Sequence, residues 1–424
     1  MTLEQTSVDI NLGDDTIFER GESHAAFKRL RREAPIHWNP GNEMVKGWWN
    51  VTKFEDVLDI SRRTDVFSSE DGITAFAPVN AEDAAAAANG NGKMLITMDP
   101  PNHVRVRRLI NKGFTPRAVG AMEGEIRRIT NEVLDSIARK GSCDFVLEVA
   151  SQLPLAIICG MMGLEKNDWP LMFELTNKVL GQSDPEYQTD VPEEQRGTPE
   201  AARMTGNMGI MQMFGFFAQL LQQRRANPGG HDLVSILIES EVDGEKLTDE
   251  DILWFSFLLI LAGNETTRNA ISGGMLTLND HPDQRARLQA DMSLLPVAVE
   301  EILRYVSPVT HMARVALADT TVRGQKVAKG ERVVMWYPSV NRDEDVFPDA
   351  DRFDIARTPN DHLAFGIGEH FCLGAGFARL ELKVMFEELF RRFPDIHVSG
   401  PVERLRSNFI GGIKHLPVSF TPER

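Results

Sequence analysis

The chain has 424 residues, of which 42% are hydrophobic and 25% are charged, a composition typical of globular proteins with a sizeable core. Its 46 Lys and Arg residues against 62 Asp and Glu residues give a formal net charge of −16, which argues against general nucleic-acid binding and against broad docking on anionic lipid. Three widely spaced cysteines, Cys143, Cys159 and Cys372, form neither a disulfide framework nor a zinc-binding spacing, so we expect a reducing compartment.

The expected elements are mostly helices. In chain order, helical periodicity marks residues 120–139, 199–226, 249–278, 283–305 and 376–393, and short β-rich runs mark residues 46–51 and 321–336. We therefore predict a mainly α protein with a minor β part. No repeat or Pro/Ser-rich linker divides the chain, so residues 1–424 are expected to form one domain, with its small β part assembled from the N- and C-terminal regions.

An irregular stretch, residues 67–98, interrupts this pattern and contains a low-complexity patch at residues 81–92. A loop of this length is often a lid or a binding loop, and the alternative is a solvated surface insertion. Residues 1–15 lack the basic start and apolar core of a signal peptide. The most apolar runs, residues 153–164 and 254–263, are shorter than the ~20 residues that span a bilayer, so we expect a cytoplasmic protein without a membrane anchor.

A basic segment opens the next helix. His103 and Arg107 are four residues apart and share one helix face, whereas Arg105, Arg108 and Lys112 lie on another. Each charge taken alone is consistent with a solvated surface residue. The separation into two faces indicates two different tasks.

The helix over residues 249–278 carries an unusual middle. Residues 262–267 read Ala-Gly-Asn-Glu-Thr-Thr, poor helix formers placed directly after an apolar run. A buried acid, Glu265, beside a hydroxyl, Thr266, in a weakened turn is locally inconsistent, and such inconsistency points to function. The structural alternative is a kinked core helix whose threonine bonds back to its own backbone.

Further on, Glu301 and Arg304 share a helix face at i, i+3, a pairing that is often a plain surface ion pair.

The clearest chemical signal surrounds Cys372. Residues 365–374 read Phe-Gly-Ile-Gly-Glu-His-Phe-Cys-Leu-Gly, a loop whose glycines permit tight turns and close approach to a flat ligand. The following helix offers free N–H groups and a positive dipole end, which favour a thiolate. A lone thiolate suits either a nucleophile or a single axial metal ligand. Cys143 and Cys159 lie in apolar helical surroundings and are expected to be inert.

The spacing Phe365-x-x-Gly368-x-His370-x-Cys372-x-Gly374 resembles the haem-binding signature of the cytochrome P-450 superfamily, the haem-thiolate monooxygenases. The resemblance extends from about Phe18 to the C-terminus, with the family's motifs in the family's order. It implies the cytochrome P-450 fold, with a long central helix over the haem. It also implies haem b (iron-protoporphyrin IX) as cofactor, with Cys372 as the ligand of the iron and Phe365 packed beside the sulfur.

The resemblance assigns further roles. Glu265 and Thr266 become the catalytic acid–alcohol pair, and Ala262 leaves room beside the cofactor, whose binding residues also include Gly374. The haem propionates are expected to bind His103, Arg107, Arg314 and His370. Glu301 and Arg304 are expected to form a structural ion cluster with Arg352, from the turn at residues 347–353.

The resemblance also implies a hydrophobic substrate. Residues 184–187, 262–270 and 411–415 look like those of actinobacterial enzymes of lipid metabolism, which favours a sterol side chain, a methyl-branched lipid or a terpenoid. The expected substrate-contacting residues are nearly all apolar: Ile73, Phe76, Met94, Leu95, Val179, Val309, Met312, Phe409 and Ile410. The expected partners are O2 and a ferredoxin with its NAD(P)H ferredoxin reductase, the ferredoxin docking on Arg105, Arg108 and Lys112 of a monomer. The alternatives are a haem protein without turnover, a hydroxylase of a small aromatic or terpene, and a cysteine hydrolase.

Overall fold

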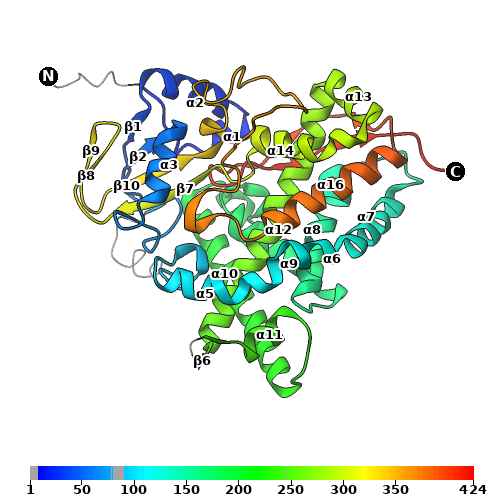
Figure 1. The fold of residues 1–424 in the computed structure, drawn as a ribbon, viewed down its shortest axis with the longest axis horizontal. Helices are drawn as coiled ribbons and strands as arrows, with labels where there is room; N and C mark the ends of the chain where they lie inside the picture. The colour runs from blue at the N-terminus through cyan, green and yellow to red at the C-terminus, as the bar shows by residue number, and fades with distance from the viewer. Residues whose placement is uncertain (1–7, 78, 80–89, 243) are drawn as a thin grey trace.

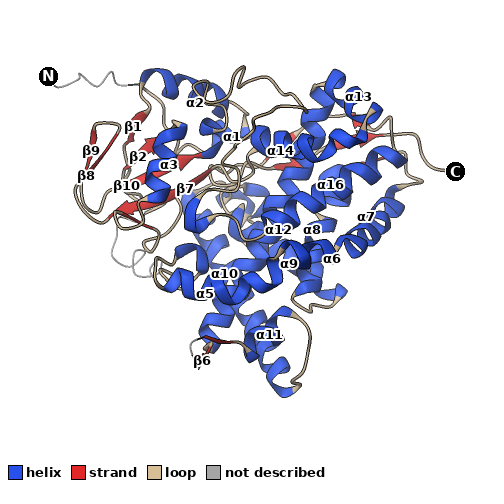
Figure 2. Cartoon of the chain, viewed as in Figure 1, coloured by secondary structure: helices blue, strands red, loops and turns tan. Residues whose placement is uncertain are grey.

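A computed structural model describes residues 8–77, 79, 90–242 and 244–424 of the chain. Its centre is α12 (Asp249–Asp280), which begins at a capping box between Thr248 and Asp251. At 1.5 Å per residue this helix is ~48 Å long, enough to cross the molecule. The helices gather around it, and the main sheet lies at one side (Figures 1 and 2). The predicted mainly α architecture with a minor β part is confirmed.

One set of helices packs on α12 or on its immediate neighbours to form the largest core, which contains Leu134, Ile271, Met275, Ile302 and Phe386. These helices are α6 (Pro116–Ala121), α7 (Glu123–Ile137), α8 (Gln152–Met161), α13 (Pro282–Ala290), α14 (Leu295–Val306) and α16 (Ala375–Arg392).

The predicted helix over residues 283–305 is interrupted. Asp291 ends α13 and accepts a hydrogen bond from the N–H of Ser293, and a short 3₁₀ turn precedes α14, which has Pro296 at its start. Proline suits the first turn of a helix because its missing N–H is not needed there. The apolar period continues across the break, which is why the sequence predicts one helix.

A second set of helices covers the other side of α12 and encloses a core that contains Met172, Leu175, Phe217, Leu221 and Ile260. These helices are α5 (Asn102–Ile110), α9 (Trp169–Leu180), α10 (Pro199–Ala226) and α11 (Leu233–Glu239). The connection between α9 and α10 runs over residues 181–198 and includes the short turns Pro185–Tyr187 and Glu193–Gln195. None of the helices in the described ranges is long and apolar enough to cross a membrane.

The main sheet joins distant parts of the chain. Its strand order is β1 (Ile36–Asn39), β2 (Trp48–Val51), β10 (Arg332–Trp336), β7 (His311–Ala316) and β3 (Phe67–Ser68). The β10–β2 pair is parallel, with Val333 opposite Trp49, and the other pairs are antiparallel. The predicted run 321–336 is divided into three strands, because Gly324 and Gly330 adopt positive φ angles of 81° and 86°.

The remaining elements are short. The small helices are α1 (Thr16–Glu19), α2 (Ser23–Glu33), α3 (Phe54–Arg62) and α15 (Tyr337–Val340). The small sheets pair β8 (Thr320–Val322) with β9 (Gln325–Val327), β5 (Glu241–Val242) with β6 (Glu245–Lys246), β12 (Glu403–Arg404) with β13 (Ile413–His415), and β14 (Pro417–Ser419) with both β4 (Ser142–Asp144) and β11 (His397–Val398). Most of the low-complexity patch at residues 81–92 lies outside the described residues.

Candidate active site

The loop that presents Cys372 is built by its glycines. Gly366 and Gly368 have φ angles of 67° and 75°, a region that residues with a side chain rarely adopt. A Cβ atom on Gly368 would lie 3.1 Å from the carbonyl oxygen of Ser61. The loop then returns on itself, so that the N–H of Cys372 donates to the carbonyl oxygen of Phe365 at 2.9 Å. Cys372 is thereby held immediately before the start of α16.

Protein groups surround the thiol of Cys372. It is accessible to solvent, yet burial among the surrounding groups raises its pKa, and the N–H of Gly374 and the charge of Arg107 lower it to a smaller extent. The N–H groups at the helix start act in the expected direction, but desolvation outweighs them, so the pKa of the thiol is raised overall. A bound metal ion would remove the proton outright.

Small residues of α12 also border an open space. Ala262 is exposed and Gly263 and Thr266 are half-buried, although they lie in the middle of a helix whose neighbouring residues Leu261 and Asn264 are buried. Exposed small side chains on the central helix of a large core require an unfilled volume beside them. This is the arrangement expected of a helix that lies over a cofactor.

Four cationic or donor residues from three separate segments meet near the cysteine loop. The rings of His103 and His370 lie 4.4 Å apart, and Arg107 and Arg314 lie close enough to act on both rings. Burial and these arginines lower the pKa of His103 to about 4 and that of His370 to about 2. Both ring nitrogens of His103 lack a hydrogen-bond partner within the described part of the chain. Such a cluster is suited to anionic groups that supply acceptors and charge.

Within the described ranges, the acids of the protein do not complete this cluster. The carboxylate of Asp99 acts on His103 and Arg314. It already accepts hydrogen bonds from the hydroxyl of Ser68 at 2.5 Å and the N–H of Ser69 at 2.9 Å. Arg314 is buried and donates to the carbonyl of Ala313. The cluster therefore fits a flat cofactor that carries carboxylates, as haem does.

Two arginines, one of them predicted, also support the loop. Arg107 donates to the carbonyl oxygens of Glu369 at 2.8 Å and Phe371 at 2.5 Å. The guanidinium of Arg379 lies over the ring of Phe365, 4.5 Å from its centroid. These contacts fix the part of the loop that precedes Cys372. The support by Arg379 was not foreseen, because nothing in its local pattern separates it from a surface arginine.

Glu265 and Thr266 have different partners. The hydroxyl of Thr266 donates to the carbonyl oxygen of Ala262 at 2.7 Å, as in the structural alternative weighed from the sequence. Glu265 is buried and forms an ion pair with Arg268 of the same helix. Burial raises the pKa of Glu265, and Arg268 opposes the shift. Arg268 was missed by the sequence analysis, although a Glu–Arg pair at i, i+3 inside an apolar helix is the signal that marks it.

The ion cluster of Glu301 and Arg304 is confirmed, but its predicted third member is wrong. Both side chains are 0% exposed and they form two hydrogen bonds, at 2.7 and 2.9 Å. The third cation is Arg357, 9% exposed, whose Nε lies 3.2 Å from Glu301. Arg352 is 63% exposed and reaches the carboxylate of Asp354 at 3.9 Å. The chain turns here so that the backbone carbonyl of Arg352, and not its side chain, faces the cluster.

The predicted substrate-contacting residues fall into two groups and one outlier. Backbone hydrogen bonds connect the neighbourhoods of Ile73, Met312 and Phe409, and a β-bridge joins Val309 to Ile410. Met94, Leu95 and Val179 belong to the core between α9, α10 and α12. Phe76 is 49% exposed. Their role in binding stays a prediction.

Three stretches singled out from the sequence converge on one network. Asp184 accepts a hydrogen bond from the ammonium of Lys414 at 3.1 Å, and the amide oxygen of Asn269 lies 3.3 Å from the N–H of Ile413. His415 lies between Asp144, at 2.6 Å, and Glu186, at 3.0 Å. The network ties the α9–α10 connection to β13 and to α12.

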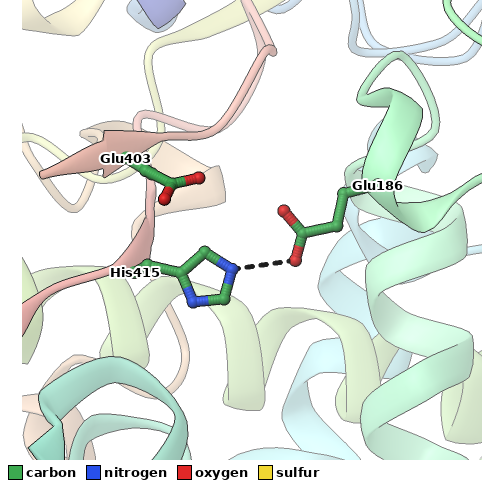
Figure 3. Close-up of side chains that lie close together, drawn as sticks. All are labelled: Glu186, Glu403 and His415. Carbon is green, nitrogen blue, oxygen red and sulfur yellow. Dashed lines mark hydrogen bonds and ion pairs between the residues drawn. The ribbon is translucent and has the colours of Figure 1, made fainter.

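The surface end of this network is a cluster of carboxylates and a histidine. Figure 3 shows Glu186, Glu403 and His415 close together, with the His415–Glu186 contact drawn. Lys414 binds the other oxygen of Glu186 at 2.9 Å. Because the cations of the protein already neutralise this carboxylate, the cluster is explained as a tether between β13 and the α9–α10 connection.

Comparisons with known proteins agree with the fold and the cysteine loop. Residues 57–405 match the cytochrome P450 family model, and the chain belongs to the cytochrome P450 family. It is a haem-thiolate monooxygenase, an enzyme class that binds haem iron and acts on hydrophobic substrates with O2 and redox partners.

Its relatives include enzymes of actinobacteria. The chain is 41% identical to a methyl-branched lipid omega-hydroxylase of Mycobacterium tuberculosis, over 99% of this chain and 95% of the relative. It is 38% identical to a steroid C26-monooxygenase of Rhodococcus jostii, over 96% and 84%. Among solved structures, a Mycobacterium marinum cytochrome P450 in complex with pseudoionone aligns with a TM-score of 0.87 and 33% identity, covering 99% of this chain and 100% of that one.

Proposed function

We propose that this enzyme hydroxylates a lipid-like substrate, namely a sterol side chain, a methyl-branched lipid or a terpenoid, at a terminal or near-terminal carbon. The observation that carries the proposal is the pair of relatives above, one named for an omega position and the other for steroid C26. The apolar character of the expected lining residues supports it, because a long hydrocarbon needs few polar anchors. Regiochemistry then depends on which end of the substrate reaches Ala262.

Haem b is the proposed cofactor, with Cys372 as its protein ligand. His103, Arg107, Arg314 and His370 would bind the two carboxylates of the porphyrin, which supply the anions that this cationic cluster lacks. When bound, haem supplies the oxidising chemistry that inserts one atom of O2 into a C–H bond. The protein holds the cofactor, excludes water and provides protons.

The chain's own proton-handling groups are Thr266 and Glu265. The Thr266 hydroxyl, now donating to the carbonyl of Ala262, can rotate to hold an oxygen or a water molecule at the open face of α12. The Glu265 carboxyl can carry protons inward when it leaves Arg268. Both roles depend on groups that exchange partners within a buried helix.

A small acidic ferredoxin with its NAD(P)H reductase is the proposed electron source. The supporting feature is the basic face of α5, which includes Arg105 and Arg108; the side chain of Lys112 lies outside the described residues. Steering between such a face and an acidic partner depends on ionic strength. We further propose that the protein is a single-domain monomer of the cytoplasm.

The test is an optical spin-shift screen of the haem-loaded protein. Sterols, methyl-branched fatty acids, terpenes and small polar aromatics are titrated, and products of the binders are identified by mass spectrometry. Lipid-like ligands should give the high-spin shift, and Cys372→Ala should lose the red-shifted Soret band of the ferrous–CO form. A strong shift with polar aromatics and none with lipids would overturn the substrate class. An unchanged Soret band in the mutant would overturn the ligand assignment.

A further inference from the structure

Glu265 lies at the boundary between two faces of α12. Successive residues of an α-helix are rotated by about 100°. Glu265 therefore projects roughly 80° from the middle of the open face formed by Ala262 and Thr266, whereas Arg268 projects about 140° from it. The carboxylate of Glu265 can consequently turn either toward the open face or toward Arg268. In the structure it turns to Arg268.

Arg268 is itself fixed by the neighbouring helix α9. Its Nη1 donates to the side-chain oxygen of Asn177 at 2.8 Å, and its guanidinium lies 5.5 Å from the ring centroid of Phe173. One helical turn earlier, the side-chain amide of Asn264 donates to the hydroxyl of Thr176 at 3.0 Å. These buried polar contacts join α9 to α12 beside the acid.

The ion pair is buried but not fully satisfied. The side chains of Arg268 and Glu265 are 2% and 1% exposed. Among the described residues, Oε1 of Glu265 and Nε of Arg268 have no hydrogen-bond partner. A partly satisfied buried pair can be disrupted more readily than a complete network. This leaves Glu265 one acceptor atom that is available to a second arrangement.

No other cation of the described residues competes for Glu265. The next basic residue of α9, Lys178, pairs with Glu174 at 2.7 Å and Asp190 at 2.6 Å. The titratable group that faces the pair from the α9–α10 connection is Tyr187, whose phenol is kept neutral by a pKa raised by burial. The charge state of Glu265 therefore depends on burial, which favours the neutral acid, and on Arg268 and the hydroxyl of Thr176, which favour the carboxylate.

We propose that Arg268, anchored by Asn177, is a positioning residue that keeps the Glu265 carboxylate ionised on the α9 side of α12. The packing of α9 on α12 in this way sets the charge state of the acid beside Thr266. The catalytic meaning of this control rests on the proposed function, but the ion pair can be tested without turnover.

The experiment is an infrared pH titration of the haem-loaded protein, read at the protonated-carboxyl band that disappears in Glu265→Gln. Loss of the cation in Arg268→Gln should raise the midpoint by about 1–3 pH units, the usual effect of a neighbouring arginine. Arg268→Lys, which retains the charge, should shift the midpoint less. Glu381 provides an internal control, because burial raises its pKa to about 8 and its band, identified with Glu381→Gln, should not move.

Asn177→Ala provides a second test in case Arg268→Gln does not fold. It keeps both charges, removes the anchor, and should raise the midpoint in the same direction by a smaller amount. The pH profile of product formed per NADPH should move with the infrared midpoint. The proposal would be overturned if the infrared midpoint of Glu265 were the same in the wild type, in Asn177→Ala and in whichever Arg268 variant folds. This holds even if hydroxylation is normal. A shifted midpoint in a protein that hydroxylates nothing would leave the positioning intact and reject the proposed function.

Discussion

The most direct test of the structure concerns Arg357, which occupies the position in the buried cluster that was predicted for Arg352. Arg357 binds Glu301 at 3.2 Å and the carbonyl oxygens of Pro348 at 2.8 Å and Arg352 at 2.8 Å. Substitution by alanine removes these bonds together. It also deprives the carboxylate of Glu301, which is 0% exposed, of its second cation.

The expected loss in the free energy of unfolding depends on the partners that Glu301 retains. Breaking a buried ion pair costs about 3–5 kcal/mol, because the remaining charge stays desolvated. Glu301 still has Arg304, the N–H of Asp354 at 2.9 Å and the amide of Asn360 at 3.2 Å. We therefore expect the lower end of that range, about 3 kcal/mol, for Arg357→Ala. Arg352→Ala removes an exposed side chain and should change the stability by less than ~0.5 kcal/mol.

The assay is denaturant unfolding followed by far-UV circular dichroism. All variants are compared at the same haem loading, since bound cofactor adds its own stabilisation. Arg357→Lys serves as the matched variant, because it keeps the charge but lacks the planar fork, and should lie between Arg357→Ala and the wild type. Equal losses for Arg352→Ala and Arg357→Ala, or a loss below ~1 kcal/mol for Arg357→Ala, would refute the reasoning.

Three further predictions concern the site and its surroundings. Thr266→Ala should keep haem and substrate binding but lower the product formed per NADPH, and full coupling would mean that its hydroxyl only serves the carbonyl of Ala262. Burial lowers the pKa of His415, but its two carboxylate partners outweigh burial and raise the pKa overall. Its contribution to stability is therefore complete below the unfolded value of about 6.5 and is lost as the pH rises through the folded value. His415→Gln should therefore lower the melting temperature more at pH 6 than at pH 9, and equal losses would contradict this. Arg108→Glu should slow reduction by an acidic ferredoxin with little effect on substrate affinity; an unchanged rate would place the docking face elsewhere.

The local features of the site could be predicted from the sequence because they depend on neighbouring residues. The cysteine loop requires glycines at 366 and 368, and both adopt positive φ angles. The long helix could be located because its capping residues and apolar run are contiguous, and it spans Asp249–Asp280. The position of Cys372 before a helix follows from the same local pattern.

Only the tertiary structure decided which side chains meet. Arg352 and Arg357 occupy the same turn-rich segment, and their sequence context does not separate the exposed one from the buried one. Likewise, the partner of Glu265 is chosen by the packing of α9 against α12, which fixes Arg268 through Asn177. The state of the Cys372 thiol was also decided here, since burial raises its pKa against the effect of the helix start. Burial and long-range pairing depend on how distant segments pack, so motif spacing specified the class of chemistry while packing set the partners and charge states of its residues.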